Sequence, residues 1–343
     1  MNTEVADITI IGAGPAGLFA AFQAGMLNIT SNIIDKSSEV GGQCTALYPE
    51  KFIYDIPGHY KITAANFIVE LKKQTDRFKP NYYLSQAVVD LSVSNNIWTA
   101  TTSTGNKVLS KKIIIATGAG FFQPRKPPLE NLREFEEKSI FYKITNIKSF
   151  NNEVVMIAGG GDSALDWTIE LANITKKIYL VHRRVDFRGN PATLKKIEDF
   201  AQQGLVQLIT PYQLQAISGS NGQLNSVTLK NSKNEYKTIS VKKLLLFFGL
   251  EFNNKAMLNW TCQPSVEKSF ITVDPSTQST NIHGIFAIGD IATHSSKTKL
   301  IVTGFAEAVT ACHSAYQQIN QKKPVVQYST VKIKNQHDVK QEA

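Results

Sequence analysis

The N-terminal sequence reads Asp7-Ile8-Thr9-Ile10-Ile11-Gly12-Ala13-Gly14-Pro15-Ala16-Gly17 and predicts a strand, a tight glycine turn and a helix. The apolar run that ends at Ile11 is typical of a buried strand, and the residues from Ala16 to Gly25 are rich in Ala, Leu and Phe. Glycines in the order Gly-x-Gly-x-x-Gly let the backbone turn sharply and approach a pyrophosphate, which lies at the positive N-terminus of the helix. The stretch therefore predicts a dinucleotide-binding βαβ unit.

An acidic residue at the appropriate distance strengthens this interpretation. A second strand is expected to end at Ile34, and the next residue, Asp35, comes 23 residues after Gly12. A carboxylate at about this distance accepts hydrogen bonds from the ribose hydroxyls of a bound dinucleotide. The nucleotide-binding residues that we expect in this unit are Gly12, Gly14, Pro15, Ala16 and Asp35.

A second glycine turn, Gly159-Gly160-Gly161-Asp162-Ser163-Ala164, follows the apolar run from Val154 to Ala158. The same spacing of 23 residues from Gly159 falls on His182, in a segment that holds no carboxylate. Arg183 and Arg184 follow it, and their guanidinium groups offer fixed donors to a 2′-phosphate, so we expect NADP rather than NAD. Arg188 either joins this cluster or is an exposed loop arginine. The predicted NADP-binding residues are Gly159, Gly161, Asp162, Ser163, Ala164, His182, Arg183, Arg184 and Arg188.

Composition narrows the class of protein. A chain of 343 residues with 42% hydrophobic and 19% charged residues is long enough for two packed domains and is neither disordered nor collagen-like. Its three cysteines form neither a disulfide framework nor a Cys-based metal site, so we expect reduced thiols, no metal and a cytoplasmic protein. The apolar stretches are shorter than the ~20 residues that cross a bilayer, and the N-terminus lacks the positive start of a signal peptide.

The net charge of +9 favours an acidic partner, whereas the dispersed basic residues do not favour nucleic acid.

The two turns and the segments between them predict an α/β protein with two Rossmann-like, three-layer ββα domains. The proline-rich segment from Gln123 to Pro128 marks one crossing between the domains, and a second crossing is expected near Gly249 to Asn254. One domain would then comprise residues 1–121 and 250–343, with a C-terminal extension from about residue 323, and the other would comprise residues 122–249. Two dinucleotide sites in one chain indicate an electron-transfer flavoprotein, with FAD in the discontinuous domain and NADPH in the other.

From Ile10 to about Thr330 the sequence resembles the two-domain flavoproteins related to thioredoxin reductase, in the pyridine nucleotide-disulfide oxidoreductase superfamily. Besides the glycine turns, the motifs that carry the resemblance are Gly41-Gly42-Gln43, Ala116-Thr117-Gly118, His182-Arg183-Arg184 and Gly289-Asp290. Three further segments resemble the ferredoxin-NADP reductases of the thioredoxin-reductase-like type: Ala46 to Lys51, Gly159 to Trp167, and Thr303-Gly304-Phe305. The resemblance implies a homodimer that exchanges electrons between NADPH and ferredoxin through FAD.

Thioredoxin reductases carry a Cys-x-x-Cys before the second glycine turn, and here that region reads Tyr142-Lys143-Ile144-Thr145. In the glutathione reductase branch, a Cys-x4-Cys pair begins after the Gly-Gly segment, but the partner position of Cys44 is Pro49. Without paired thiols the flavin cannot pass electrons into a protein disulfide. We therefore expect Cys44 to be a small buried residue and not a catalytic thiol.

The resemblance also implies roles for single residues. Tyr48 would stack on one face of the flavin, Asp35 would bind the adenosine ribose, and Asp290 would lie near the ribityl and pyrophosphate groups. In the C-terminal extension, Tyr328 would stack on the other face, within its own subunit or across the dimer. The remaining positions that match FAD-binding residues of the family are Gly12, Gly14, Pro15, Ala16, Gly42, Gln43, Val88, Phe122 and Thr330.

Two other functions share these motifs. One is an NADPH-dependent diaphorase that reduces quinones or free flavins, and the other is a flavoprotein that senses NADPH without turnover. A flavodoxin is an alternative to ferredoxin as the protein partner. Lys51, Lys297 and Lys299 follow matched motifs and are either docking residues for that partner or ordinary solvated lysines.

Overall fold

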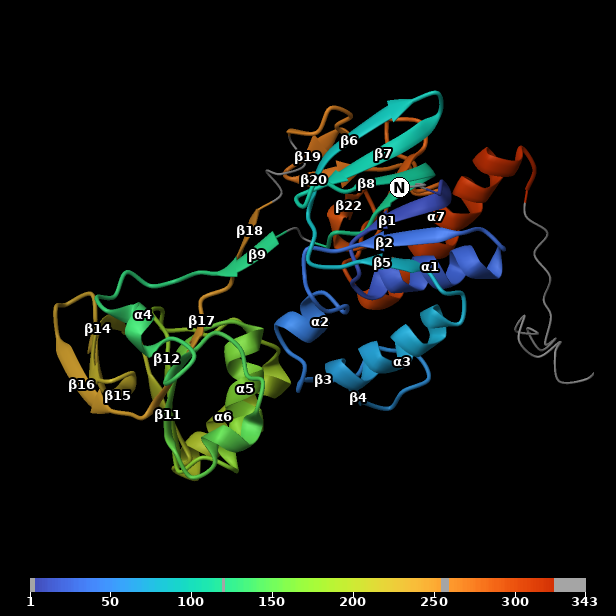
Figure 1. The fold of residues 1–343 in the computed structure, drawn as a ribbon. Coiled ribbons are helices and arrows are strands. Elements are labelled where there is room, and N and C mark those ends of the chain that lie inside the picture. Colours follow the sequence, from blue (N-terminus) through green and yellow to red (C-terminus); the bar gives the residue numbers. More distant parts are fainter. Residues whose placement is uncertain (1–3, 119–120, 254–258, 324–343) are drawn as a thin grey trace, which may run out of the picture. The chain divides into compact units, whose positions relative to one another are not determined.

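The computed structural model describes residues 4–118, 121–253 and 259–323, which form two compact units (Figure 1). The discontinuous unit contains the described residues up to Phe121 and from Phe252 onward, and the inserted unit contains Phe122–Glu251. The chain passes between them through β9 (Phe121–Pro124) and β18 (Leu250–Asn253), which pair as a two-stranded sheet.

The elements of the discontinuous unit are β1 (Ala6–Ile11), α1 (Pro15–Met26), β2 (Ser31–Ile34), α2 (Gln43–Ala46), β3 (Phe52–Ile53), β4 (Ile62–Thr63), α3 (Ala64–Asp76), β5 (Asn81–Tyr83), β6 (Val88–Ser94), β7 (Ile97–Thr102), β8 (Lys107–Ile115), β19 (Val266–Glu267), β20 (Phe270–Thr272), β21 (Ile285–Ala287), η3 (Gly289–Ile291), β22 (Ala292–Thr293) and α7 (Ile301–Asn320). Those of the inserted unit are α4 (Leu132–Phe135), β10 (Ile140–Phe141), η1 (Ile147–Phe150), β11 (Val154–Gly159), α5 (Asp162–Ala172), β12 (Lys177–Val181), α6 (Pro191–Gln202), β13 (Val206–Ile209), β14 (Gln213–Ser220), β15 (Gln223–Lys230), β16 (Tyr236–Ser240) and β17 (Lys243–Phe247).

The main sheet of the discontinuous unit has the order β5-β2-β1-β8-β7-β6, with β21 also on β8. Strand β8 joins its two parts. Its first half pairs antiparallel with β7, with Val108 opposite Ala100. Its second half is parallel to both β1 and β21, with Ile114 beside Ile10 and Phe286. Because β1, β2, β8 and β21 run in parallel and in register, the residues that follow them meet at one edge of the sheet.

Both faces of this sheet are covered, which explains why its central strands are continuous apolar runs. Ile8, Ile10 and Ile114 pack in one core against α1, α3 and α7, whereas Ile113 and Ile115 pack in a second core with residues of β6, β7 and β20. Figure 1 shows α1 and α3 beneath the parallel strands and the β6–β7–β8 ribbon above them. The result is a three-layer ββα arrangement.

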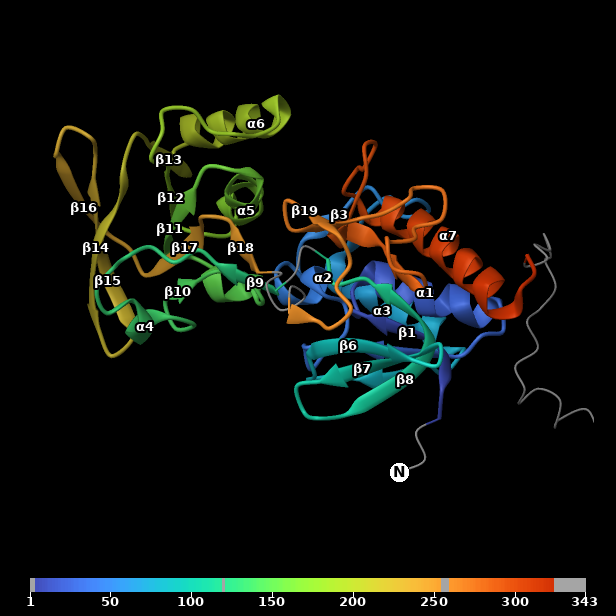
Figure 2. The ribbon, with the colours of Figure 1, turned by 90° about the horizontal axis from the view of Figure 1, so that it is seen from above.

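The inserted unit repeats this arrangement on a parallel sheet of order β10-β17-β11-β12-β13. Side chains of β11 alternate, so that Val155 and Ile157 face α5 and α6 while Met156 and Ala158 face the antiparallel sheet β14-β15-β16. Figure 2 shows these helices and this sheet on opposite sides of the parallel strands. The predicted α/β class with two Rossmann-like units is therefore confirmed.

The predicted elements agree with the observed ones to within a few residues. The first two strands end at Ile11 and Ile34 as expected, and the helix expected from Ala16 begins at Pro15. The assignment of FAD and NADPH to the two units remains a prediction. Within the described residues, no helix combines the length and apolar character that a membrane span requires.

Candidate functional site

The first glycine turn joins β1 to α1 where the backbone passes very close to its neighbours. Gly12 has φ +113°, and a Cβ atom there would lie 2.3 Å from the carbonyl oxygen of Ala116. A Cβ on Gly17 would lie 1.9 Å from the carbonyl oxygen of Gly12. Glycine is therefore required at both positions by the packing of β1, β8 and α1.

Gly14 differs, because the nearest atom to its Cβ position is the Cα of Gly42, 4.0 Å away. The protein leaves this space open, as a turn that receives a ligand would. Helix α1 begins at Pro15, and its N-cap residue, Gly14, provides no side-chain cap to the backbone donors of the first turn. Such a helix N-terminus attracts a phosphate through its dipole and its N–H groups.

Asp35 follows β2 and is fixed beside this turn. Its Oδ2 accepts a hydrogen bond from the N–H of Ala13 at 2.6 Å, and its Oδ1 accepts one from the N–H of Ser37 at 2.8 Å. Each carboxylate oxygen keeps a lone pair for a ribose hydroxyl. The carbonyl of Asp35 accepts the N–H of Gln86, which places Val88 close by, with its side chain buried in the core.

The segment after β8 contributes an unsatisfied polar atom to the same edge of the sheet. The Oγ1 of Thr117 is buried and has no hydrogen-bond partner among the described residues. The side-chain nitrogen of Gln43, the first residue of α2, lies 3.6 Å from the Cβ position of Gly118. Buried hydroxyl groups are nearly always paired, so the Thr117 hydroxyl and the open space at Gly14 both fit a bound dinucleotide.

Tyr48 and Cys44 form a contact within this region, where the thiol donates to the tyrosine oxygen at 3.7 Å. Burial, then Cys44, and then the charges of Asp290 and Asp55 raise the pKa of the Tyr48 hydroxyl, which remains protonated at neutral pH. Burial raises the pKa of the Cys44 thiol to about 11, and the residue is 1% exposed. The prediction that Cys44 is a small buried residue is confirmed.

Asp290 lies in η3, after β21, against the start of α1. Gly289 has φ +70°, and a Cβ there would lie 3.3 Å from the Cβ of Ala16. The carboxylate of Asp290 makes no hydrogen bond or ion pair within the part of the chain described. Its side chain is therefore available to a ligand at the first glycine turn.

Two of the three lysines considered for docking have neighbours that the sequence did not predict. The Lys297 side chain is 5% exposed and forms an ion pair with Glu307, so it is neither a solvated nor a docking lysine. The expectation was wrong because the partner carboxylate comes from a helix ten residues further along. The Lys299 ammonium lies 3.3 Å from the ring centroid of Phe270.

The second glycine turn combines close packing with open space in the same way. A Cβ on Gly159 would lie 2.6 Å from the carbonyl oxygen of Phe247 and 2.8 Å from the Cβ of Ala164, whereas the Cβ position of Gly161 has no atom within 4 Å. Helix α5 begins at Asp162 with no side-chain cap at Gly161, and both Asp162 and Ser163 are exposed. This turn can receive an anionic ligand by the same means as the first.

His182 packs directly on this turn, a contact that the sequence did not indicate. A Cβ on Gly160 would lie 2.2 Å from the imidazole, so the middle glycine makes room for the ring, which also stacks on Phe187 at 5.3 Å between centroids. The Nε2 atom is buried and has no partner among the described residues. It is a second unsatisfied polar atom that faces a glycine turn, and it fits a bound nucleotide.

Three arginines follow His182 within six residues, and their charges act on its imidazole. The N–H of Arg188 donates to the carbonyl oxygen of Gly160 at 2.7 Å, which brings the loop from residue 183 to 188 back to the turn. Burial, followed by the charges of Arg184, Arg183 and Arg188, lowers the pKa of His182. All three arginines are exposed residues. The structure thus assembles a neutral imidazole and three accessible cations, which suits a phosphate ester.

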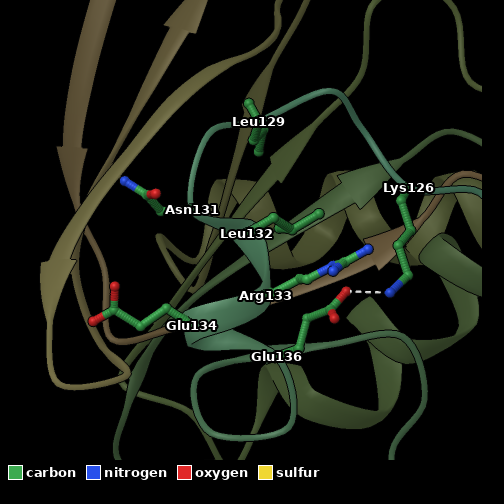
Figure 3. Close-up of a pocket in the computed structure, with 7 residues that line it drawn as sticks. All are labelled: Lys126, Leu129, Asn131, Leu132, Arg133, Glu134 and Glu136. Atoms are coloured by element: carbon green, nitrogen blue, oxygen red, sulfur yellow. Dashed lines mark hydrogen bonds and ion pairs between the residues drawn. The ribbon is translucent and has the colours of Figure 1, made fainter.

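Tyr328 and Thr330 lie outside the described residues, and Phe122 lies in β9 with a side chain that is likewise outside them. The inserted unit also has a pocket of about 490 Å³ at α4, shown in Figure 3, where Lys126 pairs with Glu136 beside Arg133. Neither glycine turn lines this pocket.

The comparisons with known proteins agree with the two-turn organisation. Residues 6–318 match the family model of the pyridine nucleotide-disulphide oxidoreductases. A protein of Wolbachia pipientis wMel named ferredoxin-NADP reductase is 49% identical over 330 residues, which cover 95% of this chain and 96% of that protein. A protein of Ehrlichia canis with the same name is 46% identical over 334 residues, with 97% and 98% covered.

Solved structures show the same fold. Thioredoxin reductase from Lactococcus lactis superposes with a TM-score of 0.76 at 22% identity, over 92% of this chain and all of that one. Thioredoxin reductase from T. acidophilum gives the same TM-score at 21% identity. The family model matches nearly the whole sequence, and relatives are almost half identical to it. The chain therefore belongs to the pyridine nucleotide-disulphide oxidoreductase family.

Proposed function

We propose that this chain is a ferredoxin-NADP reductase that uses FAD to carry electrons between NADPH and ferredoxin. The observation that carries the proposal is the presence of two open glycine turns with different neighbours, a carboxylate at Asp35 beside the first and three arginines beside the second. A carboxylate suits a ribose diol, and arginines suit a 2′-phosphate. Relatives that are 46% to 49% identical over 95% or more of the chain carry this name.

FAD would be held in the discontinuous unit. Its pyrophosphate would bind at the N-terminus of α1, its ribose at Asp35, and its ribityl group near Asp290 and the hydroxyl of Thr117. When bound, FAD accepts a hydride from NADPH and releases single electrons to a one-electron partner. Tyr48 would stay protonated while it stacks on the flavin, because its pKa is raised by burial.

NADP(H) would be held in the inserted unit. The N-terminus of α5 would bind its pyrophosphate, with Gly161, Asp162 and Ser163 at the contact. Arg183, Arg184 and Arg188 would bind the 2′-phosphate. The imidazole of His182 would orient the cofactor through its unpartnered nitrogen, which the low pKa keeps neutral.

Electron exit through a protein disulfide is not part of this proposal. All three cysteines are free, and burial raises the pKa of Cys44 to about 11 and that of Cys312 to about 12. At neutral pH such thiols are almost wholly protonated, whereas disulfide exchange needs a thiolate. Electrons would then leave from the flavin itself, and ferredoxin or flavodoxin is the acceptor that we propose.

The proposal includes a cytoplasmic homodimer in which Tyr328 stacks on the second flavin face and Thr330 contacts the flavin. The net charge of +9 supports an acidic partner that associates faster at low salt. Replacement of Tyr328 by alanine is expected to change the flavin spectrum and the rate of hydride transfer in stopped flow. An unchanged spectrum and rate would remove this residue from the proposal.

The deciding experiment is reduction of cytochrome c by the purified protein with NADPH, with and without a low-potential ferredoxin. Strong acceleration by ferredoxin, suppression by salt and poor use of NADH are expected. If ferredoxin has no effect while quinones or free flavins are reduced rapidly, the partner is wrong and the protein is a diaphorase. Reduction by NADPH without turnover on any acceptor would favour an NADPH sensor.

A further inference from the structure

We propose that Glu307 is a positioning residue, which fixes the turn at Gly289 and Asp290 in the place where it binds FAD. This inference rests on the proposed function, because it takes the first glycine turn as the FAD site. Glu307 was not among the site residues expected from the sequence, although it is the first charged residue of α7.

Three segments that are far apart in the sequence converge at the start of α1. Cβ atoms on Gly289 and on Gly304 would each lie 3.3 Å from the Cβ of Ala16, and the one on Gly304 would lie 3.6 Å from the Cα of Gly289. Helix α7 thus contacts both the N-terminus of α1 and the turn that carries Asp290. Glu307 lies three residues after Gly304, on the same face of α7.

The carboxylate of Glu307 links this helix to the turn. Its Oε2 accepts a hydrogen bond from the backbone N–H of Gly289 at 2.7 Å, and its Oε1 pairs with the ammonium of Lys297. The side chains of Glu307 and Lys297 are 9% and 5% exposed. A buried carboxylate is costly to desolvate, so each of its partners matters to the local structure.

The hydrogen bond acts on the residue next to the ligand. Gly289 occupies the left-handed region, so the direction in which Asp290 leaves the turn depends on how the Gly289 peptide is held. Glu307 holds that peptide from the side of α7, and Ala16 limits it from the side of α1. The carboxylate of Asp290 is thereby kept beside the glycine turn without a hydrogen bond of its own to the described protein.

The hydrogen-bond acceptor can be tested separately from the charge pair with two double variants. Lys297→Met with Glu307→Gln removes both charges but keeps an oxygen that accepts from Gly289. Lys297→Met with Glu307→Leu has the same charge and a similar volume but lacks the acceptor. We expect the Gln variant to bind FAD about tenfold more tightly than the Leu variant does. The release of FAD is measured by flavin fluorescence on dilution of the holoprotein.

Two further readouts distinguish positioning from a general effect on packing. The visible circular dichroism of bound flavin should change in the Leu variant and stay as in the wild type in the Gln variant. Glu267→Gln serves as the control, because Glu267 pairs with Lys268 at 3.9 Å with both side chains exposed, and it should leave FAD binding unchanged. Urea unfolding of each holoprotein reports stability independently.

Equal FAD affinity and equal flavin dichroism in the two double variants would overturn the inference, even if the Leu variant unfolds at lower urea. If the Leu variant does not fold, Gly289→Ala tests the same turn from the other side, since its Cβ would press on Ala16. Unchanged FAD binding in that variant would also overturn the inference. A wild-type protein that binds no FAD would overturn the proposed function as well.

Discussion

Arg184 should select NADPH over NADH. The charge of Arg184 lowers the pKa of His182 more than the charges of Arg183 and Arg188 do, and the imidazole of His182 packs on Gly160 of the second glycine turn. Replacement of Arg184 by glutamine removes this charge but keeps a side chain that can form hydrogen bonds. We expect the Kd for NADP⁺ and the KM for NADPH to rise, with little change for NADH, which has no 2′-phosphate to bind.

The size of the effect follows from the exposure of the side chain. A hydrogen bond to a charged group contributes about 1.5 to 3 kcal/mol, and every 1.4 kcal/mol corresponds to about a tenfold change in affinity. Arg184 is exposed to solvent, so the lower end of this range applies. The single substitution should weaken NADP⁺ binding about tenfold. Replacement of all three arginines should weaken it about 100-fold, less than the product of three independent effects, because they share one phosphate.

The assay is a titration of the holoprotein with NADP⁺ at low and high salt, together with steady-state kinetics for NADPH and NADH. Arg133→Gln is the matched control, since Arg133 is an exposed arginine of the same unit that lies at the α4 pocket. As an independent readout, the pKa of His182 measured by NMR should rise in Arg184→Gln, because a nearby positive charge has been removed. Equal losses for NADPH and NADH, or unchanged NADP⁺ binding, would refute the assignment of this cluster to the 2′-phosphate.

Three other outcomes test the structure. Gly12→Ala should yield protein without bound FAD, judged by absorbance near 450 nm, because its Cβ would lie 2.3 Å from the carbonyl oxygen of Ala116; normal FAD content would contradict the packing at the turn. Phe286→Ala should lower the free energy of unfolding, measured in urea, by about 3 to 5 kcal/mol, because the ring is fully buried. A loss below about 1 kcal/mol would contradict the burial of this ring in the core. Burial raises the pKa of Cys44 to about 11, so about 0.1% of it should be thiolate at pH 8. It should react with iodoacetamide only at higher pH, and more slowly than the partly exposed Cys262. Rapid labelling of Cys44 at pH 8 would show that the thiol is accessible.

The glycine turns made the fold predictable. Gly12 and Gly159 are required by atoms that any strand-turn-helix unit places against them, so the order of apolar run and glycines carries the information locally. The spacing to Asp35 and to His182 reflects the length of one helix and one strand. Because β2 is parallel to β1 and β12 is parallel to β11, Asp35 and His182 each follow a strand that lies beside the strand of their own glycine turn. Their roles in binding FAD and NADP(H) remain predictions.

Other features of the site were not predictable in this way. Lys297 follows a matched motif and was considered a surface residue, yet Glu307 pairs with it inside the protein. Gly160 lies in the second glycine turn but was not among the expected NADP-binding residues, and in the structure it makes room for the ring of His182. The unpaired hydroxyl of Thr117 has no signature in the sequence, because whether a threonine is satisfied depends on every atom around it.

The sequence by itself determined the two glycine turns, the α/β class and the absence of a redox cysteine pair, because each depends on residues that are close along the chain. Only the tertiary structure decided which buried groups are paired and which are not. Glu307 pairs with Gly289 and Lys297, whereas the buried Nε2 atom of His182 has no partner among the described residues. The physical reason is that burial and hydrogen bonding are set by neighbours in space, and in a parallel sheet those neighbours follow strands that are remote in sequence.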